Sequence, residues 1–189
     1  NLRNHRKLQI IDGQIAFVGG MNVGREYQGL NPSVGPWRDL QIELQGPAAS
    51  VLQESFADDW FFSTEKKLLD DAYYPPVESA PAPWATLVVA GGPDSPSLPV
   101  QKSLTAILNH AQSRAWLTAG YFVPNEVTLT ALTLCAARGV DVRLLVTEKT
   151  DHPALLRIGR SYYEELLRAG VRVFEYSLAL NHAKAGIID

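Results

Sequence analysis

The first third of the chain changes from strand-type alternation to helix-type spacing of its apolar residues. Asp12-Gly13 is a strong two-residue hairpin signal between two alternating stretches. Pro47 is suited to the first turn of a helix, and apolar side chains recur behind it at helical spacing. The elements expected here are strands over 7–12, 14–20 and 37–46 and a helix that begins at Pro47.

The second half shows strands that alternate with helices. Residues 63–83 are polar and end in YYPPVESAPAP, a composition typical of a linker. Strands separated by helices indicate βαβ crossovers, and therefore an α/β fold with a mostly parallel sheet flanked by helices. We expect strands over 85–92, 115–122, 140–148 and 171–177 and helices over 99–112, 125–138 and 153–169.

Composition and charge narrow the class of protein. The chain has 189 residues, 46% of them hydrophobic, and a net charge of -3. This is ordinary for a globular protein and argues against a broad nucleic-acid-binding face. The single cysteine, Cys135, cannot form an internal disulfide and lies in an apolar stretch, where a buried core thiol is expected. No apolar run of about 18 residues is present, which argues against a membrane span, and we find no signal peptide.

Nearly the same nonapeptide occurs near each end of the chain. NHRKLQIID occupies residues 4–12, NHAKAGIID occupies residues 181–189, and six of the nine positions are identical. The two histidines are 177 residues apart, which suggests one period of a tandem repeat. We therefore expect the chain to be a piece of a longer protein, running from one motif to the next.

Each nonapeptide carries a histidine and a lysine two positions apart. In a strand such residues share a face, whereas Asp12 and Asp189 follow at an odd spacing and face the other way. An imidazole beside an ammonium suits an anionic substrate, while the aspartates are expected to shape the hairpin or hold a backbone amide. The predicted pairs are His5 with Lys7 and His182 with Lys184.

Two histidines suit a two-step displacement at phosphorus. One attacks and forms a covalent phospho-histidine, and the other protonates the departing alkoxide and then deprotonates the incoming alcohol or water. No carboxylate cluster or Cys/His spacing indicates a metal site, and two lysines can supply the positive charge. The predicted chemistry uses neither a metal nor a cofactor.

The longer pattern around the first motif resembles a known signature. His5-x-Lys7-x4-Asp12-x6-Gly19-Gly20-x-Asn22 is similar to the HxKx4Dx6G(G/S)xN signature of the phospholipase D superfamily, and the second motif resembles its repeat as far as Asp189. Within that superfamily, AFVGGMNVGREYQG, WRDLQIELQGPAASVLQESFADDW, YFVPNE and KTDHPALLRIGRSYYEELLRAGVRVFEY look most like bacterial cardiolipin synthase.

The resemblance implies two pseudo-twofold-related α/β lobes, each with a mixed sheet flanked by helices. Residues 1–64 would be the C-terminal part of the first lobe, 65–83 a linker, and 84–189 the N-terminal part of the second. It also implies site roles, with His5 as nucleophile and His182 as acid/base. The residues expected to hold phosphate oxygens are Lys7, Lys184 and Asn22, with the backbone at Gly19 and Gly20 approaching closely.

Other polar groups keep two interpretations each. Asp39 would orient His5 through its far ring nitrogen, or form a strand-end ion pair with Arg38 or another basic residue. Tyr121 would line the pocket at the end of a strand, or pack in the core. In KTDHP, Lys149 or Asp151 would meet a lipid headgroup, or Asp151 would simply cap the following helix.

The implied activity is condensation of two phosphatidylglycerols, or of one with another phosphatidyl donor, into cardiolipin. Two alternatives stay open: hydrolysis by a phospholipase D or nuclease-type phosphodiesterase, and a non-catalytic lipid-binding fragment. The expected partners are a phospholipid substrate and a membrane surface reached through the parent protein, at the bacterial inner membrane, with the fragment itself soluble. No nucleic acid is expected as a partner. If this piece folds, two chains are expected to associate so that His5 of one meets His182 of the other.

Overall fold

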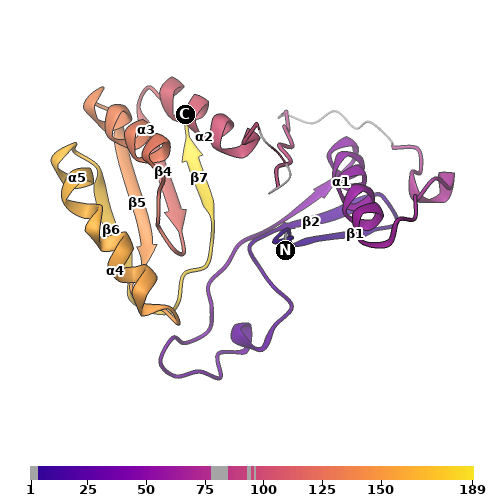
Figure 1. The fold of residues 1–189 in the computed structure, drawn as a ribbon, viewed down its shortest axis with the longest axis horizontal. Coiled ribbons are helices and arrows are strands. Elements are labelled where there is room, and N and C mark those ends of the chain that lie inside the picture. Colours follow the sequence, from indigo (N-terminus) through magenta and orange to yellow (C-terminus); the bar gives the residue numbers. More distant parts are fainter. Residues whose placement is uncertain (1–3, 78–84, 93–94, 96) are drawn as a thin grey trace. The chain divides into compact units, whose positions relative to one another are not determined.

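A computed structural model describes residues 4–77, 85–92, 95 and 97–189. The described chain forms two compact units, and Figure 1 shows their elements. Unit 1 consists of residues up to Gly19 together with Gln41–Pro99, and unit 2 consists of Gly20–Leu40 together with Val100–Asp189. The chain therefore enters unit 2 twice, first for a 21-residue excursion and then to its end.

Unit 1 is a three-stranded antiparallel sheet covered by one long helix. Its elements are β1 (Leu8–Ile11), β2 (Ile15–Gly19), β3 (Gln41–Gln45), α1 (Pro47–Thr64) and a 3-10 turn, η2 (Asp71–Tyr73), with strand order β1-β2-β3. The hairpin and the helix predicted from sequence are confirmed. Asp12 and Gly13 both have positive φ, 52° and 66°, as a tight right-twisted hairpin turn requires. Ala16, Ala49 and Leu52 form the buried core between sheet and helix.

The strand expected over 85–92 is wrong. These described residues carry no strand hydrogen-bonding pattern, and Val88 instead packs against the apolar core of unit 1. In unit 2 the strand that pairs with the outer side of β4 is β7, which belongs to the second nonapeptide. The alternating apolar pattern of 85–92 therefore reports packing of an extended segment and not a sheet ladder.

Unit 2 is a mixed α/β sheet. Its elements are a 3-10 turn, η1 (Arg25–Gln28), α2 (Pro99–His110), β4 (Arg114–Ala119), α3 (Glu126–Ala137), β5 (Asp141–Thr147), α4 (Pro153–Ser161), α5 (Tyr163–Arg168), β6 (Arg172–Tyr176) and β7 (Ala185–Ile188). The strand order is β6-β5-β4-β7, with β4, β5 and β6 parallel and β7 antiparallel to β4. The prediction of a mostly parallel sheet is confirmed.

One face of this sheet carries the main hydrophobic core. Alternate residues of β5, Val142, Leu144 and Val146, are buried against helical side chains that include Leu132 and Cys135 of α3. Cys135 is fully buried, as expected, and burial raises the pKa of its thiol. The rigid ladder of β4 and β5 consequently fixes the loops at their carboxyl ends, where α/β sheets place ligand sites.

Two predicted boundaries differ from the structure. The helix expected over 153–169 is divided into α4 and α5 at Tyr162. The histidine and lysine of each nonapeptide were expected within a strand, but β1 begins at Leu8 and β7 begins at Ala185, just after each lysine. Both pairs therefore lie on the extended segment that leads into a strand, where side chains are not masked by neighbouring strands.

Candidate active site

The excursion of residues 20–40 docks onto the second nonapeptide. Arg38 N–H donates to Leu180 O at 2.8 Å, and His182 N–H donates to Arg38 O at 2.7 Å, forming a parallel bridge between Arg38 and Asn181. A further bond from Leu180 N–H to Val34 O, also 2.8 Å, extends the contact. These backbone bonds set the position of the residues that surround His182.

The side chain of His182 is paired with a buried carboxylate. Nδ1 of His182 lies 2.8 Å from Oδ2 of Asp39, whose side chain is 0% exposed, while the imidazole is 13% exposed. Because an ionised carboxylate only accepts hydrogen bonds, Nδ1 carries the proton. The two ring nitrogens lie on opposite edges of the ring, so Nε2 points away from Asp39 and is the nitrogen offered to a substrate.

Asp39 was expected to orient His5, and this is a correction: its partner is the second histidine. The physical reason is the excursion itself, because Asp39 immediately follows Arg38, whose backbone is bonded on both sides to the second motif. The alternative was a strand-end ion pair with Arg38 or another basic residue. The carboxylate does not pair with Arg38, and its bonds go to His182, Tyr27 and the Leu40 amide.

A network of donors keeps Asp39 ionised. Burial alone would raise the pKa of Asp39, but hydrogen bonds from His182, Tyr27 and the Leu40 amide together hold that pKa below its ordinary value. The Tyr27 hydroxyl donates to Oδ2 at 2.8 Å and accepts from Asn22 N–H at 3.2 Å. Burial, aided by the Asp39 charge, raises the pKa of Tyr27 to about 12, so this hydroxyl remains a donor at neutral pH.

Aromatic rings flank the imidazole. The indole of Trp37 lies 5.1 Å from the His182 ring, centroid to centroid, and Tyr121 contacts the same ring edge-on at 6.5 Å. Tyr121, at the end of β4, thus lies against the His182 ring. These aromatic rings exclude water from the pair of His182 and Asp39, which strengthens the electrostatic interaction between the imidazole and the carboxylate.

The backbone on which His182 is mounted is anchored to the sheet. Asn181 is buried, its N–H donates to Thr147 Oγ1 at 3.0 Å, and its Nδ2 donates to Thr118 Oγ1 at 2.8 Å. A Cβ at Gly120 would lie 2.9 Å from Asn181 O and 3.2 Å from the Cα of His182. Glycine at 120 is therefore what allows the end of β4 to approach the second motif this closely.

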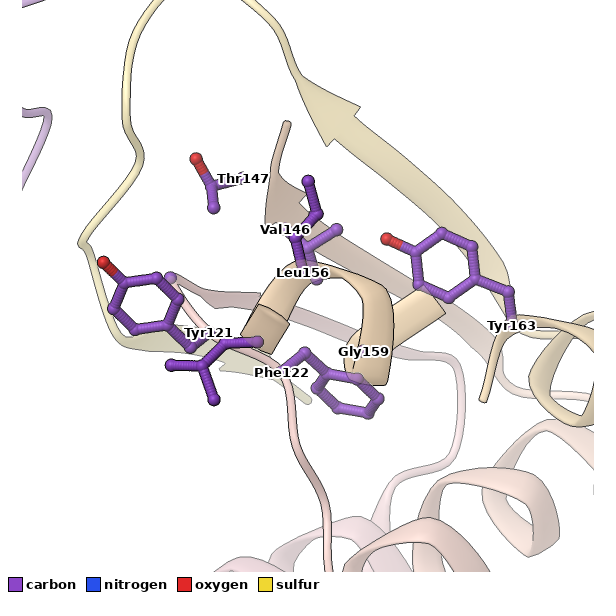
Figure 2. Close-up of a pocket in the computed structure, with 9 residues that line it drawn as sticks. Tyr121, Phe122, Val146, Thr147, Leu156, Gly159 and Tyr163 are labelled. Atoms are coloured by element: carbon purple, nitrogen blue, oxygen red, sulfur yellow. The ribbon is translucent and has the colours of Figure 1, made fainter. Parts of the chain in front are cut away.

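A small cavity lies behind Tyr121, between the ends of β4 and β5 and the first turns of α4 (Figure 2). Its volume is about 10 Å³, the space of a single water molecule, so it is too small for a phosphodiester. The lining residues include Thr147 and Tyr163. Burial and a hydrogen bond to Glu175 raise the pKa of Tyr163, which keeps it a neutral part of this wall.

The first motif is held differently, by groups of unit 1. Arg6 pairs with Asp59 and also donates to Gly91 O at 3.2 Å, and Asn4 Nδ2 donates to Asp59 Oδ2 at 2.7 Å. These bonds secure the residues on either side of His5, which is itself exposed. Arg6 thus has a structural role and leaves the neighbouring histidine accessible.

Both motif lysines fold back in the same way. Lys7 Nζ donates to His5 O at 2.7 Å, and Lys184 Nζ donates to His182 O at 2.6 Å. Each ammonium is therefore held beside the histidine of its own motif. The two motifs thus share the same lysine geometry.

The glycine-asparagine part of the first signature spans the boundary between the units. Gly19 N–H donates to Lys7 O at 3.4 Å within unit 1, whereas Gly20 and Asn22 belong to unit 2. A Cβ at Gly20 would lie 2.2 Å from Oδ1 of Asp39. The close approach predicted for this glycine is therefore made toward the Asp39 carboxylate.

Asp189 binds backbone amides. Its carboxylate accepts from the N–H groups of Ser113 at 2.7 Å, Arg114 at 3.1 Å and Gln112 at 3.3 Å, and from the Ser113 hydroxyl. The Ser113 hydroxyl, with the Arg114 and Ser113 amides, holds the pKa of Asp189 well below its usual range. This carboxylate ties β7 to the start of β4 and takes no part in the His182 network.

Sequence reasoning missed Tyr27 and Trp37 as neighbours of the second histidine. Both belong to the excursion, and nothing in their local sequence indicates which unit they join.

The described residues contain neither a cluster of metal ligands nor a helix that could cross a membrane. No group of three or more His, Cys, Asp or Glu side chains in that part of the chain is arranged to hold a metal ion. Among the same residues, none of the helices is both long enough and apolar enough to cross a membrane.

Comparison with known proteins supports the predicted resemblance. Residues 104–189 match a family described as "Cardiolipin synthase, PLD-like domain". Over its whole length the chain is 42% identical to Cardiolipin synthase A of Pseudomonas aeruginosa and covers 38% of that protein. It is 40% identical, again with all of the chain and 38% of the relative, to Cardiolipin synthase of Geobacillus kaustophilus. The similarity to cardiolipin synthases and the phospholipase D superfamily is thus confirmed, and the chain spans well under half of these relatives.

A solved structure supports the fold. The phosphatidylserine synthase of Haemophilus influenzae Rd KW20 superposes with a TM-score of 0.57 over 98% of this chain and 52% of that one. The sequence identity is 13%, so this likeness shows the fold alone. The α/β fold of phospholipase D type predicted from the sequence is confirmed.

Proposed function

We propose that this chain carries the two catalytic motifs of a phosphatidyltransferase of cardiolipin-synthase type. The reaction joins two phosphatidylglycerols into cardiolipin and releases glycerol, or joins one phosphatidylglycerol with another phosphatidyl donor and releases the headgroup of that donor. The relatives that match over the whole chain are named cardiolipin synthases. The observation that carries the proposal is the hydrogen bond from His182 Nδ1 to the buried Asp39 carboxylate.

In the first step His5 is the nucleophile. Its imidazole attacks phosphorus, a P–N bond forms, and the P–O bond to glycerol breaks. His182, protonated, gives its Nε2 proton to the departing alkoxide, so glycerol leaves neutral. The exposure of His5 and the fixing of its neighbours by Asp59 fit an attacking group that must reach a lipid headgroup.

In the second step the proton moves the other way. The hydroxyl of a second phosphatidylglycerol loses its proton to Nε2 of His182 and attacks phosphorus, and the P–N bond to His5 breaks. Asp39 favours this cycle because it holds the Nδ1–H tautomer and stabilises the imidazolium, as orienting carboxylates do in other histidine sites. This arrangement suits an acid/base that has to alternate between two protonation states.

The positive charge comes from the chain's own side chains. Lys7 and Lys184, each fixed beside its motif histidine, would bind non-bridging phosphate oxygens, with Asn22 and the backbone at Gly19 and Gly20 as further donors. Two ammonium groups can neutralise a phosphodiester in the role that metal ions have in other enzymes. The proposal therefore includes no metal and no cofactor.

We place the complete protein at the bacterial inner membrane, where its phospholipid substrate is found. Docking on the bilayer is assigned to the complete protein, and association of two chains remains part of the proposal. The first follows from the substrate class, and the second would bring His5 of one chain to His182 of another. Membrane docking is measured by flotation of the protein with phosphatidylglycerol vesicles, and association is measured by the mass of the protein in solution.

The test supplies the complete protein with vesicles of phosphatidylglycerol labelled in its phosphate. Cardiolipin and glycerol are the expected products, whereas phosphatidic acid as the sole product would favour hydrolysis. A denaturing quench at mildly alkaline pH, where a P–N bond survives, should trap the label on the peptide that contains His5, and label on the His182 peptide would reverse the two roles. His5→Ala and His182→Ala should each abolish turnover.

A further inference from the structure

We propose that Tyr121, Asp151 and His152 form a subsite for the vicinal hydroxyl groups of the alcohol, the glycerol end of the substrate. The inference rests on the proposed function, since it specifies which part of the phosphatidylglycerol headgroup is bound beside His182. It assigns these three side chains to alcohol selection rather than to the chemistry at phosphorus.

Tyr121 lies beside His182 and also contacts Asp151 and His152. The ring of Tyr121 lies between two imidazoles, 6.5 Å from that of His182 and 5.8 Å from that of His152. Its hydroxyl donates to Oδ1 of Asp151. Tyr121 follows β4 and the Asp151 loop follows β5, so the cluster occupies the carboxyl ends of two adjacent parallel strands.

Asp151 is not used by the helix that follows it. The sequence suggested that it caps α4, but the N-cap residue is His152 and no side chain makes the capping bond. Its carboxylate instead contacts Tyr121 and lies 3.6 Å from Nε2 of His152. Helix capping therefore does not account for the Asp151 carboxylate, which lies against Tyr121, itself in contact with the His182 ring.

The charge of Asp151 selects what it can bind. A carboxylate repels a phosphodiester, whereas hydroxyl groups donate to it. Its two oxygens offer about four lone-pair positions, and Tyr121 occupies only one of them. The side chain is 33% exposed and that of His152 is 63% exposed, so both are accessible to a solute. A neutral polyol therefore fits where the phosphate does not.

Tyr121 completes the subsite as a fixed donor. Burial, together with the hydrogen bond to Asp151, raises the pKa of Tyr121, so its hydroxyl remains protonated and holds the carboxylate in place. The cavity behind the Tyr121 ring, seen in Figure 2, is too small for a lipid, so the subsite does not extend in that direction.

The chemistry requires an alcohol at this position. The acid/base histidine protonates the oxygen that leaves and deprotonates the oxygen that enters, so the alcohol lies next to it in both steps. In the leaving direction the glycerol oxygen gains the proton of Nε2 as its bond to phosphorus breaks. The hydroxyls not bonded to phosphorus then extend past His182 toward Asp151 and His152.

The experiment measures alcohol selection by the complete protein. Vesicles containing unlabelled cardiolipin are incubated with an equimolar mixture of labelled glycerol and labelled 1-propanol, and the label recovered in phosphatidylglycerol and in phosphatidylpropanol is quantified, since the phosphatidylglycerol released by each cleavage carries no label. Asp151→Asn retains an oxygen for Tyr121 and should lower the glycerol-to-propanol ratio about tenfold, the order expected for losing charged hydrogen bonds. Transfer to propanol should remain within about twofold of wild type.

Glu148→Gln is the matched control, because Glu148 lies on the same loop, is exposed and loses the same charge. It should leave the ratio unchanged. A ratio unaltered in Asp151→Asn, or an equal fall with both alcohols, overturns the inference. If wild type transfers to neither alcohol, the proposed function fails, and this outcome is recognised without any variant. Tyr121→Phe keeps the ring, frees the carboxylate and should shift the ratio in the same direction by a smaller factor.

Discussion

Replacing Asp39 by asparagine tests the orientation of His182 directly. The substitution keeps the shape of the side chain but removes the charge that stabilises the imidazolium, and the asparagine amide can present a donor to Nδ1 and favour the wrong tautomer. The carboxylate is fully buried and its Oδ2 lies 2.8 Å from Nδ1 of His182. No other side chain of the described network carries a negative charge to replace it.

The size of the effect follows from the geometry. Two unit charges about 4 Å apart interact by about 4 kcal/mol at an effective dielectric constant of 20, and a charged hydrogen bond contributes about 1.5–3 kcal/mol. A loss of about 2–4 kcal/mol of transition-state stabilisation corresponds to a decrease in kcat of about 30- to 1,000-fold. KM should change little, since Asp39 is shielded from the substrate by His182.

The assay is the initial rate of cardiolipin formation from phosphatidylglycerol vesicles, with wild type and Asp39→Asn at matched protein and lipid concentrations. Tyr27→Phe is the companion variant, because it removes one hydrogen bond to the carboxylate at 2.8 Å and keeps its charge. It should lower kcat by about fivefold, the loss expected for one neutral donor. If Asp39→Asn keeps its rate within about threefold while its thermal midpoint is unchanged, the reasoning is refuted.

Four further outcomes are expected. Asp39 should stabilise the fold above pH 3.8, the ordinary pKa of its carboxyl, and this stability should be lost as the pH falls through the lowered pKa that Asp39 has in the folded protein. The free energies of unfolding of wild type and Asp39→Asn, measured by chemical denaturation, should therefore differ at neutral pH and converge below pH 3.8. Gly120→Ala should destabilise the fold by about 1–3 kcal/mol and reduce kcat, because its Cβ would press on the backbone of His182, and a melting curve with kcat measures both. Asp189→Asn should lower the thermal midpoint, since the charge that holds three amides is lost, and a midpoint equal to wild type would contradict this role. Treatment with EDTA should leave cardiolipin synthesis unchanged, and activity restored only by added metal would refute the assignment of charge to the lysines.

Local patterns predicted much of the architecture. The Asp12-Gly13 turn, the helix that begins at Pro47 and the parallel order of the second sheet follow from periodicity and turn chemistry that act over a few residues. The strand over 85–92 failed for the same reason, because alternation reports one apolar face and does not say whether a sheet edge is available to pair with it.

The composition of the candidate site was predictable, but its pairing was not. Both histidine and lysine pairs, and the importance of Asp39, were visible as residue types at fixed spacing. Which histidine Asp39 serves depends on where the excursion packs, and that is decided by backbone bonds to Leu180 and His182 about 140 residues later. A contact of such long range leaves no periodic signal in the sequence.

Residues 20–40 dock against the second motif, so the order of synthesis determines when this contact can form. Asp39 leaves the ribosome 143 residues before His182, a delay of roughly 7 to 30 s at 5–20 residues per second. During that interval His182 has not been synthesised, so the Asp39 carboxylate and the neighbouring rings of residues 20–40 have no histidine to contact. The contacts around His182 can therefore form only after the second motif has been translated.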